Sequence, residues 1–333
     1  MKIHVDRKRV LQSMLLVLAT ATLFILARHY SRGNDIGSNN KFDFNEITIN
    51  MGEFPDIRIS HEEEITIPGM EEEYEFLLLA DLHLVINESE DAGVYGNANE
   101  RIAFFSNPQG TPSAEHLPQW VAYANQQQFD AVLMDGDIID YYTDETAEYL
   151  WENMQAFEMP YVFTLGNHEL FSPWSEPIPE DSRLYDLFVN RFTAFQMLEF
   201  ADFRICAIDN NEYQVNPTSY EMLKAVIDED SEKPIILLAH VPFYTEQDRE
   251  LLEKSINTWG QALVIGSGEG TRDTTSISRD FIDLILAEES PVVAIFTGDN
   301  HFYHKGELAD GVTQWIIEPA FAGNGMILRV KGN

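Results

Sequence analysis

Acidic residues, histidines and one asparagine follow five short apolar runs of the chain, at the point where each run ends. The groups are Asp81-Leu82-His83, Asp135-Gly136-Asp137 with Asp140, Gly166-Asn167-His168-Glu169, His240, and Gly298-Asp299-Asn300-His301. Imidazole, carboxylate and amide oxygen suit borderline or hard divalent cations such as Mn, Fe, Zn or Mg. Two such cations about 3.5 to 4 Å apart can bridge a hydroxide and hold both ends of an in-line displacement at phosphorus. The residue types therefore indicate a site for divalent cations.

The apolar runs that precede these residues must bring them together. Six runs are wholly apolar and alternate with segments of helical period: 76–80, 131–134, 161–165, 203–208, 235–239 and 292–296. This pattern is typical of buried sheet strands that are connected by helices. Helices are expected near 150–157, at 218–227 after a capping box of Thr218 and Glu221, and at 277–285. Because carboxyl ends of strands in an open α/β sheet face a common crevice, residues far apart in sequence can meet there.

Four histidines lie at these predicted strand ends: His83, His168, His240 and His301. Four others do not: His4, His29, His61 and His116. A single histidine is more often a core or surface residue, and an isolated Gly-Asp pair is common turn chemistry. Four histidines in register with strand ends are hard to explain by packing alone. The ordered set is therefore the informative signal.

The series resembles the calcineurin-like metallophosphoesterases, whose motifs run D-x-H, G-D-x-x-D, G-N-H-D/E, H and G-H-x-H. The resemblance covers nearly everything from about residue 74 to the C-terminus. It implies an α/β fold, a two-sheet metallophosphoesterase sandwich flanked by helices, and a dinuclear metal-dependent phosphoric ester hydrolase. The expected substrate is a phosphomonoester or phosphodiester, attacked by a hydroxide that bridges the two divalent metal ions.

The resemblance also implies a role for each matching residue. The first metal ion would be bound by Asp81, His83 and His301. Asp137 would bridge both ions, and the second ion would be bound by Asn167 and His240. His168 would donate a proton to the leaving group, with Asp140 as the carboxylate that orients it, and Glu169 would support the ligands.

One position departs from the family pattern. Where the last motif has G-H-x-H, this chain has Gly298-Asp299-Asn300-His301. Asp299 is predicted to bind the second metal ion through oxygen, which would favour a harder ion over zinc. Two alternatives are that Asp299 only supports the ligands while His304 or water fills the place, and that the second metal ion has been lost.

The first 27 residues differ in kind from the rest. An apolar stretch at 10–27 follows the basic residues Lys2, Arg7, Lys8 and Arg9. This pattern predicts an uncleaved single-pass transmembrane anchor in the cell membrane. Cleavage after Ala27 is an alternative. By the positive-inside rule, residues 1–9 would be cytoplasmic and the bulk of the chain extracytoplasmic. A reversed anchor would place it on the cytoplasmic side. A linker at 28–41 would then lead into one metallophosphoesterase domain at 42–333. At its start, alternating apolar residues at 42–49 and 57–67 predict two or three antiparallel strands.

The net charge and the cysteine count exclude some kinds of partner and metal site. The formal net charge is -35, so binding to nucleic-acid duplexes is not expected, since a negative exterior repels the phosphate backbone. Cys206 is the single cysteine, so neither a disulfide nor a thiolate metal cluster can form within one chain, and its apolar surroundings predict a buried, inert strand residue.

A competing hypothesis from another class is a metal-holding binding or sensing protein that has lost turnover through the change at Asp299. Asn167, His168 and Asp140 are all present. They argue against this alternative, because a protein that only binds its ligand needs no proton donor.

Overall fold

The computed structural model describes residues 53–86, 98–171, 178–190, 192–268 and 274–333. All of them belong to one compact unit, Glu46–Asn333. The predicted basic segment 1–9, anchor 10–27 and linker 28–41 lie outside the described residues. Within those five ranges, no helix combines the length and the apolar character needed to cross a membrane.

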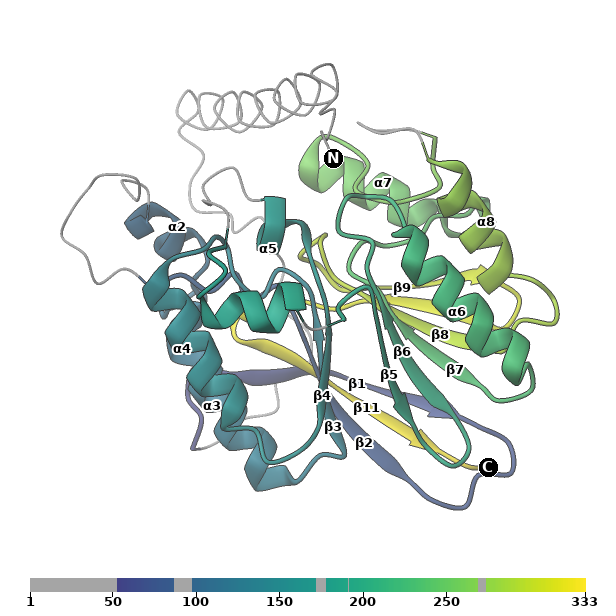
Figure 1. Ribbon diagram of the computed structural model, residues 1–333, viewed down its shortest axis with the longest axis horizontal. Helices are drawn as coiled ribbons and strands as arrows, with labels where there is room; N and C mark the ends of the chain where they lie inside the picture. Colours follow the sequence, from purple (N-terminus) through teal and green to yellow (C-terminus); the bar gives the residue numbers. More distant parts are fainter. Residues whose placement is uncertain (1–52, 87–97, 172–177, 191, 269–273) are drawn as a thin grey trace, which may run out of the picture. The chain divides into compact units, whose positions relative to one another are not determined.

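The first sheet has five strands in the order β1-β11-β2-β3-β4 (Figure 1). Their bounds are β1 Arg58–Thr66, β11 Asn324–Lys331, β2 Tyr74–Ala80, β3 Ala131–Asp135 and β4 Tyr161–Thr164. Strands β2, β3 and β4 are parallel to one another, β11 runs antiparallel to β2, and β1 runs parallel to β11. Three strands that precede predicted ligands therefore end at the same edge of this sheet.

The second sheet has six strands in the order β5-β6-β7-β8-β10-β9. Their bounds are β5 Phe195–Glu199, β6 Arg204–Ile208, β7 Ile235–Leu238, β8 Val292–Thr297, β10 Val312–Ile316 and β9 His304–Ala309. The four inner strands are parallel, and the edge strands β5 and β9 are antiparallel to their neighbours. The strands before His240 and Asp299 are neighbours in this sheet.

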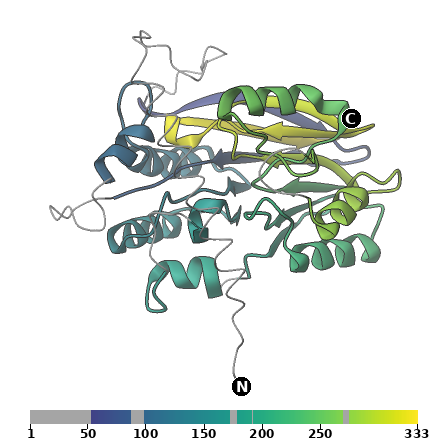
Figure 2. The ribbon, with the colours of Figure 1, turned by 90° about the horizontal axis from the view of Figure 1, so that it is seen from above.

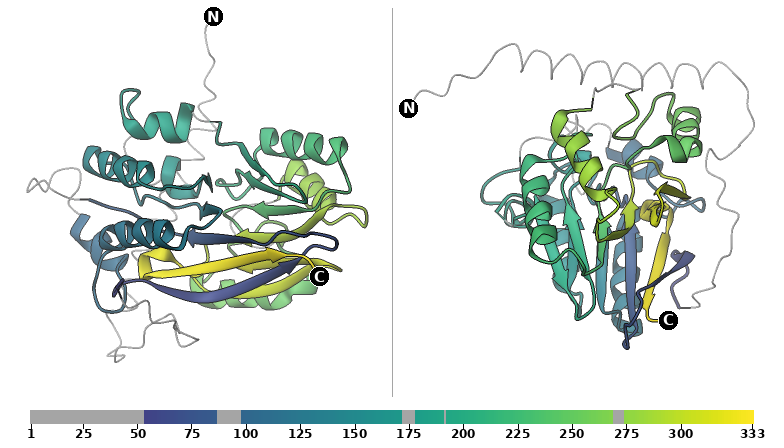
Figure 3. Two further views of the ribbon diagram at one scale, coloured as in Figure 1. Left: turned by 90° about the horizontal axis from the view of Figure 1, so that it is seen from below. Right: turned by 90° about the vertical axis from the view of Figure 1, so that its right-hand side faces the viewer.

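The two sheets pack face to face, and helices cover their outer faces (Figures 2 and 3). Helices α3 (Ser113–Gln127) and α4 (Asp144–Gln155) pack on the first sheet, and α6 (Pro217–Glu229) and α8 (Ser276–Ile285) on the second. The remaining helical elements are α2 Ala98–Phe104, α5 Asn167–Phe171, η1 Tyr185–Asn190, η2 Glu246–Asp248, α7 Arg249–Trp259 and η3 Ala320–Ala322. Apolar strands must be covered on both faces. The predicted two-sheet α/β sandwich flanked by helices is confirmed.

Two local predictions were wrong. The alternation at 57–67 forms a single strand, β1, which pairs in parallel with β11 rather than antiparallel. The segment 42–49 of the same prediction lies outside the described residues. The N-cap of helix α6 is Asn216, two residues before Thr218 of the proposed capping box, and its side chain accepts a hydrogen bond from the Thr218 N–H. Pro217 occupies the first turn, where its missing N–H costs nothing.

The lone cysteine is where its apolar run predicted. Cys206 lies in β6 and is fully buried. Burial raises the pKa of its thiol to about 12, so the reactive thiolate form is not populated near neutral pH. The prediction of a buried strand residue is confirmed.

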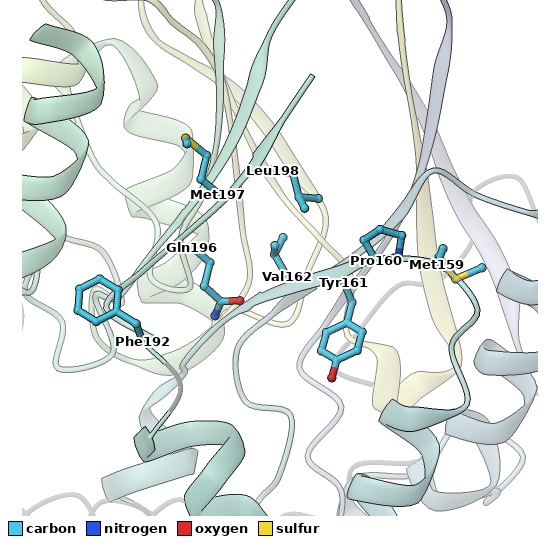
Figure 4. A pocket seen from close by; sticks show the side chains of 8 residues that line it. All are labelled: Met159, Pro160, Tyr161, Val162, Phe192, Gln196, Met197 and Leu198. Carbon is cyan, nitrogen blue, oxygen red and sulfur yellow. The ribbon is translucent and has the colours of Figure 1, made fainter. Parts of the chain in front are cut away.

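A cavity of about 590 Å³ lies between the edge strands β4 and β5 (Figure 4). Its lining is mostly apolar and consists of Met159, Pro160, Tyr161, Val162, Phe192, Gln196, Met197 and Leu198. None of the residues predicted to bind metal lines this cavity. The predicted ligands lie instead beyond the ends of β2, β3, β4, β7 and β8.

Candidate metal centre

Backbone hydrogen bonds join the loops that follow the ligand-bearing strands. The N–H groups of Asp81 and His83 donate to the carbonyl oxygens of Gly136 and Asp137, at 3.2 and 2.7 Å. In the second sheet the Gly298 N–H donates to the His240 carbonyl oxygen at 2.9 Å. The Asp299 N–H crosses to the first sheet and donates to Asp81 Oδ1 at 3.2 Å. The predicted convergence of strand ends from both sheets is therefore present.

Five of the predicted ligands have a left-handed backbone. The φ angles are 53° for Asp81, 44° for His83, 46° for Asp137, 61° for Asp299 and 54° for His301. Aspartate and histidine tolerate this region better than most residues, but each such residue still costs on the order of 1–3 kcal/mol. Conformations of this kind persist where the surroundings impose them, and they cluster at functional sites.

Two glycines permit the close approach of these loops. A Cβ atom on Gly136 would clash with the His240 ring, and one on Gly166 would clash with the backbone and carboxylate of Asp137. Gly136 also has a φ of 60°. Any larger residue at either position would push a predicted ligand out of place.

The first cluster contains Asp81, His83, Asp137 and His301, whose donor atoms all lie within 4.8 Å of one another. All four side chains are buried. The Nε2 atoms of His83 and His301 are 3.1 Å apart, and His301 Nε2 is 3.5 Å from Asp81 Oδ1. Two imidazoles and two carboxylates that converge in this way are a suitable donor set for a divalent cation.

A second set of donors adjoins the first through Asp137. Asp137 Oδ2 lies 3.5 Å from His83 Nε2 and also 3.5 Å from His240 Nε2. His240 Nε2 is in turn 3.7 Å from Asp299 Oδ1. Asn167 is the first residue of α5 and follows the end of β4 after Leu165 and Gly166. Asp137 therefore faces both donor sets, as a bridging ligand would.

Several donor atoms are buried without a hydrogen-bond partner among the described residues. They include Asp81 Oδ2, Asn167 Oδ1, His240 Nε2 and Asp299 Oδ2. Native proteins rarely leave a buried polar atom unsatisfied, because its desolvation then goes uncompensated. Bound cations would satisfy all four atoms at once, so the residues fit a metal centre.

His168 and Asp140 lie beside the first cluster. His168 Nδ1 is 2.9 Å from Asp140 Oδ1, and the His168 N–H donates to Asp137 Oδ1 at 2.9 Å. Burial alone would lower the pKa of His168, but the carboxylates of Asp137 and Asp140 raise it to about 9. Burial likewise opposes ionisation of Asp140, yet hydrogen bonds from Arg101, His168 and His83 hold its pKa well below the usual value. An imidazole hydrogen-bonded to a carboxylate in this way is a suitable arrangement for a proton donor.

Asp299 is held by Tyr213, which the sequence did not single out. The Tyr213 hydroxyl donates to Asp299 Oδ1 at 2.7 Å. Burial raises the pKa of Asp299 to about 6, although His240 opposes the rise. His304 is paired elsewhere, with its Nε2 2.9 and 2.8 Å from the two carboxylate oxygens of Asp248. Of the two candidates for completing the second donor set, Asp299 is the one that faces it.

Glu169 supports the loops rather than the donor cluster. Its buried carboxylate accepts hydrogen bonds from the backbone N–H groups of Asp137, Ile138, Ile139 and Gly166. Burial, together with the charge of Asp137, raises its pKa to about 7. The carboxylate ties the loop after β3 to the loop after β4.

Comparison with known proteins settles the family. The sequence model of the calcineurin-like phosphoesterases matches residues 74–265, more than half of the chain. The chain belongs to the calcineurin-like phosphoesterase family. The match begins at β2 and includes the ligand groups that follow β2, β3, β4 and β7. The resemblance inferred from the motifs is confirmed.

The chain is also similar to several solved structures. A dimetal phosphatase from Danio rerio is 14% identical, with a TM-score of 0.44 over 75% of this chain and 88% of that one. The protein TT1561 of Thermus thermophilus is 10% identical, with a TM-score of 0.39 over 75% and 90% of the two chains. A 5'-nucleotidase from Candida albicans is 13% identical, with a TM-score of 0.37 over 74% and 45%. No curated protein matches the chain significantly.

Three residues of this phosphoesterase's centre escaped sequence reasoning. Arg101 forms a two-pronged ion pair with Asp140, Phe105 stacks on the His83 ring with centroids 3.9 Å apart, and Tyr213 holds Asp299. None of them follows an apolar run or stands at a motif spacing. Their only sequence signal is that Arg101 and Phe105 lie in a stretch with little periodicity directly after the first ligands.

Proposed function

We propose that this phosphoesterase hydrolyses phosphomonoester or phosphodiester bonds with two divalent cations. The observation that carries the proposal is the position of Asp137, whose Oδ2 lies 3.5 Å from a histidine of each donor set. One carboxylate oxygen shared by two sets of ligands suits a dinuclear centre. Asp81, His83 and His301 would hold one cation, and the second would be held by Asn167, His240 and Asp299.

The cations, when bound, would lower the pKa of a water molecule and neutralise phosphate charge. His168 would protonate the leaving oxygen. Asp140 engages Nδ1 of the His168 ring, so Nε2 is the nitrogen that gives its proton to the leaving oxygen. The P–O ester bond breaks, its electron pair stays on that oxygen, and the attacking water oxygen remains on phosphorus. The His168 side chain is 15% exposed, against 1% for His83 and 0% for His240, which leaves it access to a substrate.

The charge of the centre supports an anionic substrate in an acidic protein. Three ligating aspartates, Asp81, Asp137 and Asp299, leave a positive surplus on two divalent ions. The formal charge of the whole chain is -35, so this local surplus is what would draw in a phosphate. An oxygen donor from Asp299 also favours Mn²⁺, Fe²⁺ or Mg²⁺ over Zn²⁺.

The place of the reaction is a separate proposal, which rests on the sequence alone. The basic cluster before the apolar segment 10–27 favours a single-pass anchor with an extracytoplasmic catalytic domain. Protease added to intact cells should then degrade the domain while a cytoplasmic marker survives. Protection of the domain until the cells are lysed would refute this orientation.

The activity is tested with the full chain in detergent. Metal analysis should give about two divalent ions per chain, and p-nitrophenyl phosphate or its bis ester should be hydrolysed with Mn²⁺. Asp137→Asn should abolish activity and reduce metal content, whereas Asp280→Asn on the exposed side of α8 should change neither. If no metal supports hydrolysis and Asp137→Asn still binds phosphate as the unsubstituted protein does, the chain is a metal-holding binding protein and the proposal is wrong.

A further inference from the structure

Arg101 is a buried cation that reaches the centre from outside the motifs. It lies in α2, between the first and second ligand groups, and its side chain is 8% exposed. Its Nε donates to Asp140 Oδ2 at 2.6 Å and its Nη2 to Asp140 Oδ1 at 2.5 Å. Two parallel N–H bonds to one carboxylate fix both the position and the plane of that carboxylate.

The carboxylate that Arg101 fixes is in turn shared by two histidines. Asp140 Oδ1 lies 2.9 Å from His168 Nδ1 and 3.4 Å from His83 Nδ1. His168 Nδ1 also lies 2.8 Å from the backbone carbonyl oxygen of Asp140. A rotation of the Asp140 side chain would therefore remove one of the two oxygens that orient the His168 ring. The guanidinium fork is the contact that opposes this rotation.

A second contact couples Arg101 to the same region. Its guanidinium carbon is 4.7 Å from the centroid of the Phe105 ring, and Phe105 stacks on His83 with an interplanar angle of 2°. The Phe105 N–H donates to the Arg101 carbonyl oxygen at 2.9 Å, so the two residues belong to one helical turn. The end of α2 thus presents a cation and an aromatic face to the centre together.

We propose that Arg101 is a positioning residue, which acts through Asp140 to hold the His168 ring where Nε2 can protonate the leaving oxygen. This inference rests on the proposed function. The water oxygen bonds to phosphorus, the P–O ester bond breaks, and the departing oxygen takes the His168 proton. Arg101 itself neither gives nor takes a proton. Its loss should matter most for a leaving group that cannot depart without a proton.

The test uses the full chain in detergent and two esters that differ in their leaving group. Phenyl esters release a poor leaving group, and p-nitrophenyl esters release a good one that needs little protonation. General acid catalysis contributes about 10²–10⁴-fold. We expect Arg101→Met to lower kcat about 100-fold for the phenyl ester and less than about 10-fold for the p-nitrophenyl ester, with KM and metal content nearly unchanged.

Two further variants make the result interpretable. Arg101→Lys keeps the charge but loses the two parallel N–H bonds. Its kcat should also fall more for the phenyl ester than for the p-nitrophenyl ester, but by a smaller factor. It replaces Arg101→Met in the test if Arg101→Met does not fold. Arg204→Met is the matched control, because Arg204 is also buried and paired with a carboxylate, Glu199, but lies at the opposite end of β6 from the centre. It should lower both rates equally or not at all.

The outcomes separate the two proposals. Unsubstituted protein that hydrolyses neither ester with any metal overturns the proposed function, and the role of Arg101 with it. An active protein whose Arg101 variants lose the two rates by the same factor, or lose nothing, overturns the role of Arg101 alone. A selective loss on the phenyl ester, absent from Arg204→Met, supports it.

Discussion

His116 should make the folded state sensitive to acid. It lies in α3, is fully buried, and neither ring nitrogen has a hydrogen-bond partner among the described residues. Its ring is against the backbone of Ala320 and Phe321 in the turn η3. The Phe321 N–H in that turn donates to the Asp81 carbonyl oxygen at 3.1 Å. Charging this ring would disturb both the core and the support of a predicted ligand.

The size of the effect follows from the pKa. Burial penalises the charged imidazole and lowers the pKa of His116 from 6.5 to about 4. His116 therefore binds a proton more tightly in the unfolded chain than in the folded one. Its contribution to the free energy of unfolding is complete above about pH 6.5 and is lost as the pH falls toward 4. At about 1.4 kcal/mol per pKa unit the full effect is about 3.4 kcal/mol, of which about 2.5 kcal/mol is lost between pH 7.5 and 4.5.

Urea unfolding at both pH values, with EDTA present throughout, measures this loss. The comparison is with His116→Leu, which removes the titrating group and leaves every other acid-sensitive group in place. The unsubstituted protein should lose about 2.5 kcal/mol more than His116→Leu between the two pH values. Losses that agree within about 0.5 kcal/mol would refute the reasoning, because the ring would then be solvated or paired in the folded state.

Three other changes probe the centre. Tyr213→Phe removes the hydrogen bond to Asp299, so affinity for the second cation should fall about 10-fold or more, measured by metal titration, and unchanged affinity would count against Asp299 as a ligand. Gly166→Ala should displace Asp137 and lower both metal content and activity. In Gly110→Ala the added Cβ meets no atom within 4 Å but is strained by the φ of 88°, so this variant should lose stability while it preserves metal content and activity. Removing metal with EDTA should lower the melting temperature by a few degrees, and restoring Mn²⁺ should recover it. A free Mn²⁺ concentration of 100 times Kd stabilises the folded state by about 2.7 kcal/mol. Identical melting curves would speak against a resident cation.

Sequence predicted the parts of this protein that local pattern and chain direction determine. The apolar run at 76–80 lies within β2, and Asp81 follows it directly. The run at 235–239 likewise contains β7, and His240 comes next. Because parallel strands end at one edge, knowing where each run ends was enough to gather donors from both sheets.

The remaining parts depend on contacts that local periodicity does not contain. Arg101 meets Asp140 across 39 residues of sequence, and Tyr213 meets Asp299 across 86. The same limit explains β1, whose parallel partner is the last strand of the chain. Helix α3 was not predicted, and its Pro118 is atypical of a helix beyond the first turn.

The charge balance of the centre explains why these distant contacts matter. Asp140 is a further carboxylate beside the donor set, 3.4 Å from the ring of His83. Without a cationic partner, the buried Asp140 carboxylate would reduce the positive potential that attracts a phosphate. Its desolvation would also go uncompensated. The fork of Arg101 cancels that charge locally. The surplus of two divalent ions over three ligating aspartates then remains available to an anionic substrate, even though the chain as a whole carries a charge of -35.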